Sequence, residues 1–268
     1  MKTSAILLYA GLLSSAVASC KSELGKAEQI TIPLAGKDGF RNSEKWGDVI
    51  TKTIEQPPFR SIVLSGTADI KFSQGDKQSV AATGNEKAIE HYNITVKNEV
   101  LYISPATSAP QNMPSIKLTI TAPVLKTIEI NGTGDIDIKN TAEFENDLSV
   151  IVSGTGDIDL GNIICNNLDI LINGTGDVKA KKMKCKKANI NISGTGDIDS
   201  EIKAEDINMR IFGSGDADLE VRCTNLYIQA KGTGEIEVEG ECVNLTKETG
   251  GLSRIDTRDL KTQRIQLK

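Results

Sequence analysis

The 268-residue sequence has few aromatic residues and a single histidine. Aromatic side chains make up 4% of the chain, which leaves little surface on which sugars or bases can stack. The formal net charge of −5 argues against a nucleic-acid-binding protein. A serine or cysteine triad needs a histidine base, and we interpret His91 as an ordinary surface residue. Cys-x-x-Cys spacing is also missing, so no cysteine-based metal site is expected.

No apolar run in the sequence is long enough to span a bilayer, and the clearest short one lies near the N-terminus. Residues 5–13 are largely apolar and too few to span a bilayer, which is typical of an export signal over residues 1–19. The tetrapeptide Val17-Ala18-Ser19-Cys20 resembles a bacterial lipobox, whose cysteine is acylated and becomes the mature N-terminus. We therefore expect lipid attachment at Cys20 and anchoring in a membrane through acyl chains. An ordinary signal peptide with an incidental cysteine is the alternative.

The residue after this cysteine bears on the destination. An aspartate directly after the cysteine would resemble the signal for retention in the inner membrane. This position holds Lys21, so the pattern resembles that of outer-membrane lipoproteins. We expect an exported protein that is lipid-anchored to the outer membrane, on its periplasmic or its cell-surface side.

The chain is rich in glycine, and many of its 24 glycines belong to one repeated hexapeptide. The clearest copy is Gly154-Thr155-Gly156-Asp157-Ile158-Asp159. Copies recur every 19 to 22 residues and begin at Gly132, Gly154, Gly174, Gly194, Gly213 and Gly232, with a weaker one at Gly251. This spacing predicts a solenoid with one supersecondary unit per repeat.

Apolar residues alternate with polar ones on both sides of each glycine corner. In the copy at Gly174, Ile170 and Ile172 precede the corner, and Val178 and Ala180 follow it. Alternation with period two predicts two short half-buried strands per repeat, joined at the Gly-Thr-Gly bend. We therefore predict an all-β fold, a parallel β-helix or solenoid of repeats about 20 residues long. Right-handed winding is expected because parallel crossovers are usually right-handed.

Four segments follow from these patterns: a signal peptide (1–19), a tether (20–56), an N-terminal β region (57–122), and solenoid repeats with a C-terminal cap (123–268). The N-terminal β region includes an isolated first repeat copy around Gly66, a short helix near residues 85–91 and a hairpin turn at Asn98-Glu99. We interpret it as a cap, because an uncapped first rung exposes an unpaired edge. Trp46 and residues 30–32 are candidates to pack against the first strands.

Two further sequence segments resemble those of a known family. They are residues 59–66 (FRSIVLSG) and residues 122–128 (APVLKTI), which accompany the lipobox and the Gly-Thr-Gly-Asp copies. Together they resemble the putative auto-transporter adhesin, head GIN-domain family of Bacteroidetes-type bacteria, from about Pro57 to the C-terminus. The resemblance implies a β-helical, exported protein of the cell envelope, often a lipoprotein, and a role as an adhesin.

Four cysteines stand nine residues before a repeat glycine: Cys165, Cys185, Cys223 and Cys242. Stacking places Cys165 above Cys185 and Cys223 above Cys242. Two rung-to-rung disulfides in an oxidising compartment fit this column, and so do free thiols that fill a small inward position.

The corner carboxylates are the candidate ligand-binding groups. The first outward column is Asp135, Asp157, Asp177, Asp197, Asp216 and Glu235; the second is Asp137, Asp159, Asp199, Asp218 and Glu237. Repulsion between stacked carboxylates favours a hard cation such as calcium. The alternative is a solvated face whose carboxylates accept backbone hydrogen bonds. We expect no cofactor and no metal site; if calcium does bind, the first-column aspartates are its candidate ligands, and Lys179 interrupts the second column.

Hydroxyl and guanidinium groups recur as well. A column of Thr133, Thr155, Thr175, Thr195, Ser214 and Thr233 either satisfies its own hydrogen bonds or presents hydroxyls to a glycan or to ice. Arg254, Arg258 and Arg264 are interpreted as a polar cap on the last rung.

No catalytic residue is predicted, because the carboxylates form regular ladders where a glycosidase needs one singular pair. We predict a non-catalytic, lipid-anchored envelope solenoid for surface adhesion to glycan, protein or host-matrix ligands. A self-associating envelope scaffold, and so a homo-oligomer, is one alternative, and a carbohydrate-active β-helix enzyme is another.

Overall fold

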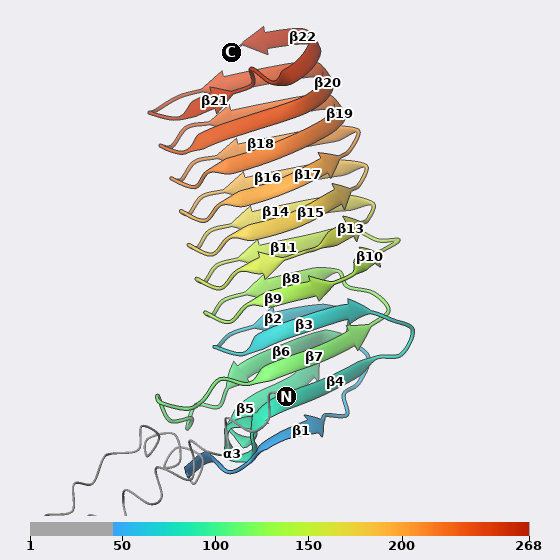
Figure 1. Ribbon diagram of the computed structural model, residues 1–268, viewed down its shortest axis with the longest axis vertical. Coiled ribbons are helices and arrows are strands. Elements are labelled where there is room, and N and C mark those ends of the chain that lie inside the picture. The colour runs from blue at the N-terminus through green and yellow to red at the C-terminus, as the bar shows by residue number, and fades with distance from the viewer. Residues whose placement is uncertain (1–44, 268) are drawn as a thin grey trace, which may run out of the picture. The chain divides into compact units, whose positions relative to one another are not determined.

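Each glycine-corner repeat forms one rung of a parallel β-solenoid (Figure 1). The computed structural model describes residues 45–267, so the predicted signal peptide, Cys20 and residues 20–44 of the tether lie outside the described residues. Within that range the strands form one continuous hydrogen-bonded network. The predicted all-β, parallel solenoid is confirmed, whereas right-handed winding stays a prediction. No helix among residues 45–267 has the length and apolar character needed to cross a membrane.

The strands that precede the glycine corners form one ladder, called ladder A. Its repeat members are β8 (Thr127–Ile130), β11 (Leu148–Val152), β14 (Asn167–Ile172), β16 (Lys187–Ile192), β18 (Asp206–Ile211) and the later parts of β19 (Ala217–Ala230) and β20 (Glu235–Thr249). All of these pairings are parallel. Ile170 pairs with Ile190, and Ile190 pairs with Met209. All three side chains are buried, so the predicted apolar columns run along the rod.

The strands that follow the corners form ladder B. Its repeat members are β9 (Ile136–Lys139), β10 (Thr141–Glu143), β12 (Ile158–Asp159), β13 (Asn162–Ile164), β15 (Val178–Lys184), β17 (Ile198–Lys203), the first parts of β19 and β20, and β21 (Arg254–Asp256). Their inward residues also stack in register: Ile158 pairs with Val178 and Val178 with Ile198. The core lies between the two ladders. Each fully buried aliphatic side chain contributes about 1.5–3 kcal/mol, so stability accumulates rung by rung.

The sequence suggested an isolated first repeat copy, but the structure places this copy in the stack. Its strands are β2 (Ser61–Leu64) and β3 (Asp69–Gln74). β2 pairs with β8 in ladder A, and β3 pairs with β9 in ladder B, both in parallel. The copy around Gly66 is therefore a regular rung, and the 66-residue interval to the next copy contains an insertion that leaves the stack and returns to it.

The insertion builds the N-terminal end of the rod. It contains β4 (Ser79–Asn85), α3 (Glu86–Glu90), β5 (Tyr92–Lys97), β6 (Val100–Pro105) and β7 (Lys117–Ala122). β6 and β7 continue the two ladders in parallel, whereas β4 and β5 add antiparallel edge strands. Asn98 and Glu99 have φ values of 51° and 62°, as the predicted two-residue hairpin turn requires.

The folded body begins earlier than the predicted boundary at residue 56. β1 (Val49–Thr53) pairs antiparallel with β4, and the Trp46 side chain is only 3% exposed. Asn85 donates a side-chain hydrogen bond to the carbonyl oxygen of Gly47 at 2.8 Å. The predicted tether was therefore too long at its C-terminal end, because residues 45–56 have no periodic pattern and yet pack onto the inserted strands.

At the opposite end, β22 (Leu260–Leu267) forms the last described rung. It pairs in parallel with β20 along one side. Ile265 and Leu267 continue the inward register of ladder A but are 61% and 72% exposed. This end of the described rod thus carries apolar side chains that no further described strand covers.

Candidate functional site

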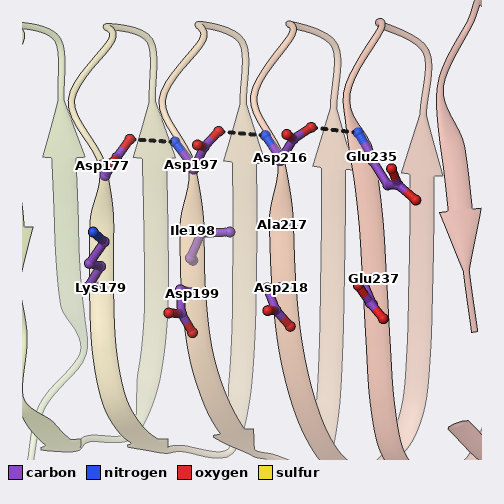
Figure 2. Close-up of a pocket in the computed structure, with 10 residues that line it drawn as sticks. All are labelled: Asp177, Lys179, Asp197, Ile198, Asp199, Asp216, Ala217, Asp218, Glu235 and Glu237. Atoms are coloured by element: carbon purple, nitrogen blue, oxygen red, sulfur yellow. Dashed lines mark hydrogen bonds between the residues drawn. The ribbon is translucent and has the colours of Figure 1, made fainter. Parts of the chain in front are cut away.

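The outward carboxylates gather on ladder B near the C-terminal end of the rod (Figure 2). Three consecutive strands, β17, β19 and β20, present carboxylates at alternate outward positions, spaced about 4.8 Å between rungs and about 6.6 Å along each strand. We call this group the acid face; it consists of Asp197, Asp199, Glu201, Asp216, Asp218, Glu220, Glu235, Glu237 and Glu239. A shallow hollow of about 360 Å³ lies over its first two columns and extends to Asp177 and Lys179.

The third column of the acid face, Glu201, Glu220 and Glu239, was missed in the sequence analysis. Glu201 pairs with Glu220 and Glu220 with Glu239 across the ladder. The period-two alternation that gave the first two columns continues by one more outward residue, and following it further would have found the third. Lys182 forms an ion pair with Glu201 at 2.5 Å and so neutralises the N-terminal end of that column.

First-column carboxylates have a structural role at the corner. From one rung to the next, the Oδ1 atom of the aspartate accepts a hydrogen bond from the backbone N–H of the equivalent residue. Dashed lines in Figure 2 show the bonds that link Asp177, Asp197, Asp216 and Glu235. The distances are 2.9 Å from Asp157 to Asp135, 2.8 Å from Asp177 to Asp157, 2.9 Å from Asp197 to Asp177, and 2.7 Å for the next two steps. Each carboxylate thereby satisfies a backbone group that the bend leaves without a strand partner.

The calcium candidates Asp135, Asp157, Asp177, Asp197 and Asp216 do lie in one column, as predicted, but they do not converge. Within residues 45–267, no group of three or more His, Cys, Asp or Glu side chains is arranged to hold a metal ion. Calcium needs six to eight oxygen ligands. A cation at this face would therefore bridge neighbouring rungs and use solvent or ligand oxygens to complete its coordination.

The first two carboxylate columns end beside arginines. Arg254 takes the place of the next first-column carboxylate and contacts Glu235 at 2.9 Å. Asp256 follows Glu237 in the second column, and its side chain is 8% exposed and contacts Arg254 and Arg258 at 3.0 and 2.6 Å. These contacts fit the predicted polar cap for Arg254 and Arg258. Arg264 lies elsewhere, opposite Asn244 in ladder A.

Asp256 gives the cap a defined pH dependence. Hydrogen bonds from the side chain and backbone of Arg258, with the nearby Arg254 charge, lower the pKa of Asp256 from 3.8 to about 2. Since the folded pKa lies below the unfolded one, the stabilisation is present above pH of about 4 and is lost as pH falls toward 2.

We expect Asp256→Asn to lower stability at pH 7 and to flatten the stability change between pH 4 and pH 2. Urea unfolding across that range measures it, with Asp218→Asn on the acid face as the matched control. An unchanged acid transition in Asp256→Asn contradicts the assignment.

The hydroxyl column is partly self-satisfied. Thr233 donates a hydrogen bond to the Ser214 hydroxyl at 2.8 Å. At the first rung, the Thr67 and Tyr92 hydroxyls lie 3.1 Å apart. These contacts favour the structural interpretation of the column at those two places.

The cysteines lie at the second corner of each rung, where ladder B leads into ladder A. All four are free thiols in this structure, and Cys223 pairs directly with Cys242 in the strand register. Burial raises the pKa of Cys223 to about 12. In the other pair, the hydrogen bond to Cys185 and burial raise the pKa of Cys165, and the same hydrogen bond lowers the pKa of Cys185. The structure thus has the free-thiol arrangement of the two that the sequence allowed.

His91 packs in the N-terminal end of the rod. Its ring meets the Trp46 ring edge-on, with centroids 6.1 Å apart. The four described cysteines all belong to later rungs, so none of them is brought to the histidine as a triad would need.

The chain matches a known protein family over most of its length. The family described as "putative auto-transporter adhesin, head GIN domain" matches residues 58–201 and 197–268. The chain belongs to this family. No curated protein matches it. The match begins at the first rung and runs to the end of the chain, so it includes both ladders and the acid face.

Solved structures resemble this chain in fold. A putative adhesin from Bacteroides fragilis NCTC 9343 has 20% identity and a TM-score of 0.54, covering 82% of this chain and 97% of its own. A putative adhesin from Parabacteroides distasonis ATCC 8503 has 17% identity, a TM-score of 0.64, and coverage of 83% and 98%. One from Parabacteroides merdae ATCC 43184 has 16% identity, a TM-score of 0.63, and coverage of 83% and 97%. At these identities the likeness shows the fold alone.

Proposed function

We propose that this protein is an exported, lipid-anchored adhesin of the cell envelope that binds an extended glycan or protein ligand without chemically changing it. The observation that carries the proposal is the regularity of the outward side chains. Carboxylates recur on every rung of the acid face, and their first column is committed to backbone hydrogen bonds. A periodic surface of this kind suits a large or repetitive partner, whereas catalysis needs one singular cluster.

The N-terminal sequence supports the location. Residues 1–19 have the composition of an export signal, and Cys20 stands where lipoproteins are acylated. Two or more acyl chains are needed for firm anchoring, and lipid on Cys20 would hold the rod at the outer membrane. The family description, which names an adhesin, agrees with such a surface role.

Charge narrows the class of ligand for the acid face. Of its nine carboxylates, Glu201 and Glu235 are paired with Lys182 and Arg254. The other seven repel anionic partners and favour either basic protein segments or anionic ligands bridged by calcium. Only the calcium-bridged mode needs a divalent cation. Binding measured with and without a chelator therefore distinguishes the two modes.

The test is a glycan and matrix-protein array probed with the full chain carrying Cys20→Ser, which prevents acylation. It is run with calcium and with chelator. We expect saturable binding to a defined class of ligand, because the ligand-facing surface is preformed. Loss of binding with chelator assigns the bridging mode to the acid face, and retention assigns the basic-segment mode. A blank array together with a monomeric sizing profile contradicts the adhesin proposal.

One observation favours a second function, a self-associating envelope scaffold. β22 presents Ile265 and Leu267 at the last described rung, where they continue the core column without a described strand above them. Exposed strand edges pair readily with other chains. Concentration-dependent assembly in the sizing profile, abolished by Ile265→Lys, favours this second function over adhesion.

A further inference from the structure

The hairpin of β5 and β6 is hollowed on its outward face around Tyr102. The hollow has a volume of about 400 Å³, a size typical of small-ligand sites. Its lining consists of Asn93, Thr95, Lys97, Tyr102 and Ser104. Ile94 and Ile103, which alternate with these residues, are buried in the core and hold the hairpin on the end of ladder A.

The strand register places polar groups around the tyrosine ring. Thr95 lies directly opposite Tyr102, and Asn93 lies opposite Ser104 on the same face. Directly opposed β-carbons are about 5 Å apart and diagonal neighbours about 7–8 Å apart. The hydroxyls and the amide therefore surround the ring at distances that match the width of one sugar unit.

These side chains are not used to hold the fold together. Among residues 45–267, no hydrogen bond or ion pair joins the side chains of Asn93, Thr95, Lys97, Tyr102 or Ser104 to another residue. The carboxylate of Glu99, at the hairpin turn, is already paired with Arg60 at 3.6 Å. Lys97 thus keeps a positive charge that no described carboxylate neutralises, on a protein whose formal net charge is −5.

Tyr102 is also unusual for this chain. Aromatic residues are scarce, and most large ones are buried, but Tyr102 is 41% exposed. A flat aromatic ring on a rigid strand offers an apolar face for the C–H groups of a sugar and a hydroxyl at its edge. The Lys97 ammonium group provides a charge-assisted hydrogen bond to an anion.

We propose that this hollow is a binding subsite for a carboxylated sugar. Tyr102 stacks on the sugar ring, Asn93, Thr95 and Ser104 hydrogen-bond to its hydroxyls, and Lys97 pairs with its carboxylate. The proposal rests on the proposed adhesin function and adds to it the class of glycan and the place where it binds. The carboxylate is shared by uronic and sialic acids, so both are used as probes.

The experiment measures binding of trigalacturonate and 3′-sialyllactose to the full chain with Cys20→Ser, by calorimetry and saturation-transfer NMR. The neutral counterparts are methyl-esterified trigalacturonate and lactose. We expect saturable binding of at least one carboxylated probe, with Tyr102→Ala weakening it about tenfold or more. Lys97→Gln is expected to remove the preference for the carboxylated over the neutral probe.

Two variants serve as matched controls. Phe212→Ala removes another exposed aromatic ring, which is 48% exposed and directly follows β18, several rungs away from the hairpin. Lys117→Gln removes an exposed lysine on β7 of ladder B. Both are expected to bind the probes as the parent chain does.

The outcomes separate the subsite from the function. Glycan binding on the array that Tyr102→Ala and Lys97→Gln leave unchanged overturns the subsite and retains the adhesin. The subsite is also overturned if neither carboxylated probe binds. A hexaglutamate peptide serves as a carboxylated probe without a sugar. If it binds the parent chain, and Tyr102→Ala and Lys97→Gln each abolish that binding, the assignment of the ligand as a sugar is overturned. A blank array together with a monomeric sizing profile is the result that removes the adhesin function itself.

Discussion

Replacing Gly194 by alanine is expected to abolish the folded rod. A β-carbon at Gly194 would overlap the carbonyl oxygen of Gly174 and the backbone of Asn173 in the preceding rung. Backbone atoms cannot swing aside as a long side chain can. Relieving the overlap would separate two rungs and break the hydrogen bonds from Gly194 N–H to Ile172 O (3.2 Å) and from Thr195 N–H to Gly174 O (3.0 Å). We expect a loss of about 4 kcal/mol or more, at the upper end of single substitutions.

Gly250→Ala is the matched control for this prediction. A β-carbon there meets its nearest atom, the Lys231 Cγ, at 3.5 Å, which is ordinary van der Waals contact. We expect its unfolding midpoint in urea to stay close to that of the parent chain. Equal midpoints for Gly194→Ala and Gly250→Ala would show that the rungs do not pack at the distance described.

Trp46→Ala is expected to destabilise the body by about 3–5 kcal/mol, the range for truncating a buried aromatic residue. Trp46 is 3% exposed and packs against His91 at the N-terminal end of the rod. Its loss leaves a cavity beside α3, whose residues Ala88 and Ile89 are buried. The same change is neutral if residues 45–56 belong to a tether, so the measurement also decides where the body begins.

Thermal unfolding monitored by circular dichroism provides the comparison, with Val49→Ala as control. Val49 lies on β1 in the same segment but is 69% exposed, so its truncation should shift the melting temperature little. A Trp46→Ala variant that melts with the Val49→Ala control would restore the tether boundary near residue 56.

A subsite for a single sugar unit is expected where the repeat is broken, whereas the periodic acid face suits an extended partner. Corner glycines, first-column aspartates and inward aliphatic residues recur because every rung must stack on the next. The hairpin of β5 and β6 belongs to the insertion, where packing does not dictate the outward side chains. Its exposed tyrosine, and its lysine that pairs with no carboxylate among residues 45–267, are therefore more informative about a small ligand than any single carboxylate of the acid face.

Some features could be predicted because they depend on local chemistry. Alternation around Gly174 fixed which residues face inward, and Asn98-Glu99 predicted a turn that needs two positive φ angles. The carboxylate columns followed from the repeat spacing. The hydrogen bond that each first-column aspartate accepts was one of two alternatives, and only the stacked geometry shows which backbone N–H it meets.

Other features depend on contacts between distant segments. Trp46 has no periodic neighbours in the sequence, yet its side chain is buried and its ring meets that of His91, at the end of α3. The rung at Gly66 looked isolated because 66 residues separate it from the next copy, whereas in space it pairs with β8 and β9. A loop closure of that length costs little more entropy than a short one, so the chain can leave the stack and return.

The sequence by itself determined the repeat, the glycine corners, the two strands per rung and the first two outward carboxylate columns. These follow from side-chain period and from backbone angles, which act over a few residues. Only the tertiary structure decided that residues 45–56 belong to the body and that the first two carboxylate columns continue into Arg254 and Asp256. It also decided that Tyr102 stands among polar side chains that have no partner within residues 45–267. Each of these depends on which strands become neighbours, and strand pairing across an insertion is set by the packing of the whole core.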